Sequence, residues 1–168
     1  MWYILYCPKQ NEAEIICSCK QRLSDRALMD AFILTYDRMR RYQGAWHLEQ
    51  QPLFPNYVFL ETKDGKQLSE ELQQYQHIVQ ALGEKDCLIP LHQEEEQFLQ
   101  NLCGQSHHLN MSRGYISNGQ THVTEGPLFG KEEQIRRIDR HKRLARIETP
   151  RGHDSACILA GLEIVEKK

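Results

Sequence analysis

Apolar residues near the start of the chain follow first a strand-like and then a helical pattern. Residues 2–7 are aromatic and aliphatic up to Pro8, which is typical of a buried strand. Residues 11–23 repeat apolar side chains at helical spacing, with Asn11 at the expected N-cap and acidic residues in the first turn. The pattern therefore predicts a strand followed by an amphipathic helix.

The next hundred residues continue this alternation of strands and helices. The pattern predicts strands at residues 31–36, 57–60 and 78–82, helices at 66–75 and 94–103, and a hairpin or flexible loop at 37–44. The prolines at 52 and 55 exclude a helix before the strand at 57–60. This order predicts an α+β N-terminal domain, in which helices flank an antiparallel sheet.

The pattern changes after Gly104, where a polar stretch at residues 106–112 is the best candidate for a linker. From there on, short apolar runs separated by turn residues predict strands at 115–116, 122–124, 134–138, 144–148, 156–159 and 162–165. Such closely spaced strands are typical of a small all-β barrel. We therefore expect two domains, at residues 1–105 and 113–168.

The net charge of the whole chain hides an uneven distribution. With 21 basic and 23 acidic side chains the formal charge is −2, which argues against a protein that binds nucleic acid over its whole surface. Residues 1–105, however, carry 10 basic and 15 acidic side chains, a net charge of −5, and residues 106–168 carry 11 and 8, a net charge of +3. Halves of opposite charge indicate two different partners.

The positive charge is concentrated in a basic stripe, defined as the seven Lys and Arg residues between Arg136 and Arg151. Only Asp139 and Glu148 oppose them, so this segment has a charge of +5. Apolar residues alternate with the cations, so one side of the segment can pack while the other contacts RNA phosphates. A solvated hairpin without a ligand is the alternative that composition leaves open.

Motifs of enzymes and cofactor sites are missing from the sequence. It contains no glycine-rich nucleotide loop, no Gly-x-Ser-x-Gly and no His-Glu-x-x-His, so we expect no cofactor, no bound metal and no enzyme. A site built on Cys103 and His107 is the remaining enzymatic alternative. Residues 1–6 have no basic start and reach Pro8 too soon for a secretory leader, so we expect none, and no apolar run approaches the roughly 18 residues of a membrane span. We expect a cytoplasmic protein with free thiols and no membrane partner.

Aromatic residues suggest a second contact surface. In the strand at 57–60, alternation places Tyr57 and Phe59 on one face and Val58 on the other. If helices cover only one side of the sheet, the other side leaves an aromatic patch for a protein partner. Periodicity does not decide which face is covered.

Two groups of motifs resemble the NusG family. Trp-Tyr-Ile-Leu-Tyr-Cys at residues 2–7 and Phe-Pro-Asn-Tyr-Val-Phe at 54–59 resemble its N-terminal domain. Val-Thr-Glu-Gly-Pro-Leu-Phe-Gly at 123–130, leading to the run at 135–147, resembles the KOW domain that follows. Within the family, residues 138–145 are most similar to the specialised LoaP branch of antiterminators.

The resemblance implies a transcription factor that acts on elongation and has two macromolecular partners. The N-terminal domain is then expected to bind the clamp helices of RNA polymerase through Tyr6, Phe54, Tyr57 and Phe59. The KOW domain is expected to bind a structured leader RNA and so promote terminator readthrough in a long biosynthetic operon. Its candidate RNA-binding residues are Lys131, Arg136, Arg137, Arg140, His141, Lys142, Arg143 and Arg146. Non-template DNA is a further expected partner, and we expect a monomer.

Three points stay open in this comparison. The alternative function is that of a general NusG-type factor whose KOW domain binds a protein, such as Rho or a ribosomal protein. Glu133 stands where the KOW motif usually has glycine, so either it adopts a positive φ at a cost of about 1 kcal/mol or more, or the turn has another shape. Residues 136–148 are also compatible with a helical hairpin, as in some specialised relatives.

Overall fold

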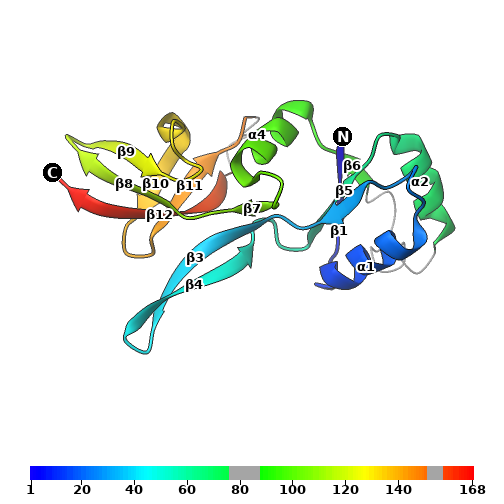
Figure 1. Ribbon diagram of the computed structural model, residues 1–168, viewed down its shortest axis with the longest axis horizontal. Coiled ribbons are helices and arrows are strands. Elements are labelled where there is room, and N and C mark those ends of the chain that lie inside the picture. The colour runs from blue at the N-terminus through cyan, green and yellow to red at the C-terminus, as the bar shows by residue number, and fades with distance from the viewer. Residues whose placement is uncertain (76–87, 151–156) are drawn as a thin grey trace. The chain divides into compact units, whose positions relative to one another are not determined.

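The computed structural model describes residues 1–75, 88–150 and 157–168 (Figure 1). The chain divides into two compact units, one made of Met1–Ile33 and Phe54–Glu96 and the other of Leu34–Leu53 and Gln97–Lys168. The strand predicted at 78–82 lies outside the described residues, as do Cys87 and Arg151.

The first unit contains a four-stranded sheet in the order β2-β5-β1-β6, in which all neighbouring strands are antiparallel. Its strands are β1 (Trp2–Tyr6), β2 (Asp30–Phe32), β5 (Tyr57–Glu61) and β6 (Leu88–Pro90). Its helices are α1 (Glu12–Arg22) and α2 (Gly65–Gln74), and α4 (Gln93–Cys103) begins in this unit. The α+β prediction for the N-terminal part is confirmed.

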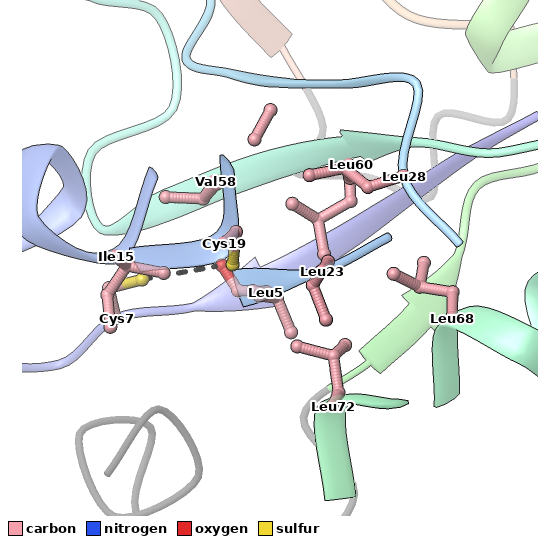
Figure 2. Packing of buried hydrophobic residues seen from close by; sticks show 11 residues of the cluster. Leu5, Cys7, Ile15, Cys19, Leu23, Leu28, Val58, Leu60, Leu68 and Leu72 are labelled. Atoms are coloured by element: carbon pink, nitrogen blue, oxygen red, sulfur yellow. Dashed lines mark hydrogen bonds between the residues drawn. The ribbon is translucent and has the colours of Figure 1, made fainter. Parts of the chain in front are cut away.

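One face of this sheet forms the hydrophobic core with the helices. Leu5, Val58 and Leu60 point to this face and are at most 1% exposed. Figure 2 shows them packed with side chains of α1 and α2, among them Cys19 and Leu68. The helices therefore cover the face of Val58, which leaves Tyr57 and Phe59 on the other side of the sheet.

The two helices of this core begin differently. Asp64 caps α2, because its carboxylate accepts hydrogen bonds from the backbone N–H groups of Lys66 and Gln67, both at 3.1 Å. Asn11 directly precedes α1 as predicted, but its side chain makes no capping hydrogen bond. The acidic residues of the first turn, Glu12 and Glu14, provide the favourable charge at this end of α1.

The single strand predicted at residues 31–36 is wrong. The chain leaves the first sheet after β2 and enters a different sheet at β3 (Thr35–Tyr42), which pairs with β4 (Ala45–Pro52). Gln43 and Gly44 join these two strands with φ values of 52° and 77°, the signature of a tight two-residue hairpin turn. Residues 37–44 are thus a regular hairpin rather than a flexible loop.

The second unit contains a five-stranded sheet in the order β10-β11-β12-β8-β9 and a three-stranded sheet in the order β4-β3-β7. The remaining strands are β7 (His108–Leu109), β8 (Ser112–Ser117), β9 (Gln120–Glu125), β10 (Ile135–Asp139), β11 (Leu144–Glu148) and β12 (Cys157–Lys167). The two strands predicted after residue 155 are one continuous strand, β12. Residues 136–148 form strands β10 and β11 and the turn between them, so the helical alternative is not observed.

Residues 106–112, expected to be a linker, contain β7 and the first residue of β8. Strand β7 pairs in parallel with β3, with Thr35 opposite His108. The predicted domain boundaries stay a prediction, and the compact units group the hairpin of β3 and β4 with the C-terminal residues.

The turn between β9 and β10 differs from the expected KOW turn. Its positive φ values fall on Gly126 and Gly130, at 95° and 73°, where glycine carries no steric penalty. Glu133 lies in a short 3₁₀ helix, Glu132–Gln134. The turn therefore has another shape, and Glu133 does not have to adopt a left-handed conformation.

Strand β3 approaches β12 closely at Gly161. A Cβ atom at this position would lie 2.6 Å from the carbonyl oxygen of Asp37 and would also meet the sulfur of Met111. The backbone contact cannot be relieved by a side-chain movement, so glycine is required for the hairpin to pack against β12.

Gly161→Ala is expected to destabilise the protein by about 1–3 kcal/mol, the usual cost of overpacking a tight contact. The measurement is the free energy of unfolding in urea. Val165→Ala, an exposed change on the same strand, is the control and should stay within about 0.5 kcal/mol of wild type. Equal stability of the two variants would show that β3 and β12 do not need this close approach.

Candidate protein and nucleic-acid interfaces

The face of the first sheet opposite the helices carries an aromatic cluster. The ring of Trp2 lies edge-on to Phe32 and Phe59, with centroids 5.0 and 5.9 Å apart, and Phe54 lies 5.8 Å from Phe59. Phe59 is only 2% exposed. Of the four residues predicted to contact polymerase, Phe59 therefore packs against Phe54 and has almost no free surface itself.

The other end of this face is open. Tyr6 and Tyr57 are cross-strand partners whose rings lie 5.3 Å apart, and Tyr6 is 42% exposed. Ile4 and Ile89 are paired on the same face, and Ile89 is 51% exposed. We define the aromatic patch as Ile4, Tyr6, Phe54, Tyr57 and Ile89.

Sequence reasoning missed two members of the aromatic patch, Ile4 and Ile89. Ile4 could have been found, because alternation along β1 places it on the face of Tyr6. Ile89 could not, because its position depends on the register between β1 and β6.

Two arginines of the basic stripe are held by carboxylates. Arg136 forms an ion pair with Glu148 on the neighbouring strand. Arg143 lies 3.0 Å from a carboxylate oxygen of Glu163, and its guanidinium stacks over the ring of Trp46 at 4.1 Å from the centroid. These contacts make Arg136 and Arg143 parts of the fold rather than free phosphate ligands.

Other cations of the stripe line a cavity of about 270 Å³, which we call the cation cavity. Its charged lining residues are Arg38, Arg137, Lys142, Arg146 and Asp139. Its apolar lining residues are Leu144, Ala145 and Leu159. Arg137 and Arg146 are cross-strand partners on β10 and β11, whereas Arg38 comes from β3 of the hairpin.

Arg38 is the cation of this cavity that sequence reasoning missed. The only signal was the run of three arginines in residues 38–41, which lies about a hundred residues from the basic stripe. Its contribution follows from the packing of the hairpin with the C-terminal sheet, which residue types alone do not reveal.

The remaining predicted RNA-binding residues lie outside the cavity. Arg140 and His141 are exposed in the turn between β10 and β11, and Lys131 is half-buried just before the 3₁₀ helix. Hydrogen bonds from backbone N–H groups in this region lower the pKa of Glu132, whose carboxylate accepts from the N–H of Val123 at 3.1 Å. The structure thus brings three of the eight predicted residues together in the cavity.

A buried carboxylate positions the strand that carries Arg38. Asp37 is 7% exposed and accepts hydrogen bonds from Nε2 of His108 at 2.8 Å and from the N–H of Met111 at 2.9 Å. The other ring nitrogen of His108 pairs with the hydroxyl of Thr35 at 2.7 Å. A neutral ring protonated on Nε2 satisfies both partners.

The five cysteines in the described ranges are free thiols, of which Cys7, Cys19 and Cys103 are buried and Cys17 and Cys157 are exposed. Burial raises the pKa of Cys103 to about 12, and burial, followed by the proximity of Cys7, does the same for Cys19. Cys103 is therefore almost entirely protonated at neutral pH and a poor nucleophile. Among the described residues no group of three or more His, Cys, Asp or Glu side chains could hold a metal ion.

Comparison with known proteins identifies the family. The first unit has an antiparallel sheet with helices on one face and the aromatic patch on the other. The family model described as transcription termination factor nusG matches residues 1–100, so the chain belongs to the NusG family. The family acts in transcription elongation and termination, and its members bind RNA polymerase. A search of curated proteins returned no match.

No helix within the described ranges is long and apolar enough to span a membrane.

Arg143→Asn is expected to destabilise the protein by about 1–2 kcal/mol, because it removes the contacts with Trp46 and Glu163. Asparagine is chosen because Arg143 has a φ of 52°, a conformation that asparagine tolerates. The measurement is the urea unfolding midpoint, with Arg140→Asn in the same exposed turn as the control. If both variants unfold at the same midpoint as wild type, Arg143 is not a structural residue.

Proposed function

We propose that this NusG-family protein is a specialised antitermination factor of the LoaP type. Its N-terminal domain binds the clamp helices of RNA polymerase, and its C-terminal residues form a KOW barrel that binds a structured leader RNA. The result is processive readthrough of terminators in a long biosynthetic operon. The protein acts in the cytoplasm as a monomer and performs no covalent chemistry, so it works by biasing the polymerase toward its processive state.

The aromatic patch supports the polymerase contact. Tyr6, Phe54 and Tyr57 are available at the open end of the sheet, and Ile4 and Ile89 extend the apolar area around them. An aromatic and aliphatic patch of this kind suits the side chains of a partner helix. Phe59 contributes by holding Phe54 and Trp2 in place.

The unneutralised part of the basic stripe is the observation that carries the RNA-binding proposal. In the described part of the chain, Arg137, Arg140, Lys142 and Arg146 have no ion pair, whereas Arg113, Arg136 and Arg143 each have one. A group of unpaired cations on adjacent strands and their turn favours a polyanion. The protein-binding alternative of a general NusG-type factor would favour a more apolar surface.

Tyr6→Ala combined with Tyr57→Ala is expected to weaken polymerase binding at least tenfold, because two central aromatic contacts are lost. Binding is measured by titrating labelled protein with bacterial core polymerase. Phe129→Ala removes an exposed aromatic side chain from the second unit and is the matched control. Retained binding by the double variant, with the control unchanged, would rule out the aromatic patch as the polymerase contact.

Arg140→Ala combined with Lys142→Ala is expected to lower affinity for the leader transcript of the neighbouring operon by roughly tenfold or more, and to reduce the salt slope by about 2. Polymerase binding should not change. Lys9→Ala combined with Lys63→Ala removes the same charge from exposed positions of the first unit and is the control.

The functional test is terminator readthrough by purified polymerase on templates with and without the leader. Readthrough that requires the leader, and that the Arg140 and Lys142 double variant loses, supports the proposal. Readthrough on both templates, with weak RNA binding that is indifferent to sequence, would instead support a general NusG-type factor.

A further inference from the structure

The cation cavity is lined by apolar residues as well as by cations, whereas contact with phosphate groups requires only the cations. Its four cations outnumber its one carboxylate, so the side chains that line it have a net charge of +3. Leu144, Ala145 and Leu159 complete the lining, and of these Leu159 is half-buried whereas Leu144 and Ala145 are at most 7% exposed. The cavity thus combines positive charge with apolar surface at Leu159, against which one face of a base can pack.

The four cations of the cavity make no polar side-chain contact with other described residues. In the described part of the chain, none of the side chains of Arg38, Arg137, Lys142 and Arg146 forms an ion pair or a hydrogen bond. On β3, in contrast, Arg40 is paired with Glu49 at 3.3 Å. Entry of a negative ligand would lower the repulsion among the four like charges around the cavity.

The one carboxylate in the cavity has a partner that fixes its position. An oxygen of Asp139 accepts a hydrogen bond from the N–H of Lys142 at 3.0 Å, which closes the turn between β10 and β11. Its second oxygen has no hydrogen bond within the described residues and can accept one from an amino group of a ligand.

Size decides which part of a nucleic acid fits. A volume of about 270 Å³ corresponds to about nine water molecules and lies just below the usual range of small-ligand sites. A double helix cannot enter such a cavity, whereas a single nucleotide turned out of an RNA loop can. Its phosphate would meet the cations, and its base would lie on the apolar lining and against the guanidinium planes.

We propose that the cation cavity binds one unpaired nucleotide of the RNA, and that Arg38 of the β3–β4 hairpin is one of its ligands. This inference rests on the proposed RNA-binding function and adds to it a specific site and a residue from a distant part of the chain. The RNA-binding surface is then composite, because the hairpin supplies one wall and the C-terminal sheet supplies the others.

The test compares two RNA probes, a pool of stem–loops with randomised loops and a blunt-ended duplex of matched composition. Arg38→Gln is expected to weaken stem–loop binding about tenfold and duplex binding less than about threefold. Arg41→Gln is the matched control, because it removes the same charge from an exposed position on the same strand that does not line the cavity. It should affect both probes equally and weakly.

A second variant distinguishes the contribution of the cavity's open volume from that of its positive charge. Leu159→Trp fills the cavity and leaves every cation in place, so it should also weaken stem–loop binding selectively; circular dichroism checks that the variant is folded. If Arg38→Gln and Arg41→Gln behave alike, or if Leu159→Trp binds stem–loops as tightly as wild type, the nucleotide site is wrong while RNA binding stands. If the wild-type protein binds neither probe nor the leader transcript, the proposed function itself fails.

Discussion

The buried carboxylate of Asp37 is the interaction on which the arrangement of the second unit depends. A charge that is 7% exposed is stable only with hydrogen-bond partners, and Asp37 takes them from His108 and from the backbone of Met111. Both partners lie in the segment that the sequence suggested was a linker. By satisfying Asp37, this segment becomes ordered as β7 beside β3, and β3 in turn passes over Gly161 of β12. The hydrogen bonds that Asp37 needs therefore help to fix the position of the β3–β4 hairpin within the second unit.

The position of the β3–β4 hairpin determines which of the nearby basic residues have contacts within the protein and which line the cation cavity. Trp46 of β4 stacks on Arg143, and Arg38 of β3 joins Arg137, Lys142 and Arg146 around the cation cavity. Arg143 also contacts Glu163, which offsets the strain of its positive φ. Residues that look equivalent in the sequence therefore have two roles: some are neutralised and stabilise the fold, and others keep their charge available to a ligand.

Local periodicity was sufficient for the elements whose apolar spacing is unambiguous, such as β1, α1, α2 and β5. It failed at residues 31–36 because the apolar run continues through Ile33 and Leu34, where the chain passes from one sheet to another. The candidate sites were partly predictable for the same reason. Alternation places Tyr57 and Phe59 on one face, but burial of Phe59 and the contributions of Ile89 and Arg38 follow from strand register and long-range packing. Strand register and long-range packing leave no local signal in the sequence.

Under the proposed function, affinity and selectivity for RNA have different structural sources. Exposed cations such as Arg140 in the turn can contact any phosphate, and such contacts position a nucleic acid without reading it. A cavity that admits one nucleotide requires that a base be unpaired at the right place, which a regular duplex does not provide. Because one wall of this cavity is Arg38, the proposed nucleotide site depends on the position of β3, which Asp37 links to β7. A NusG-family protein could therefore gain preference for a particular RNA through packing of its hairpin, without a larger overall charge.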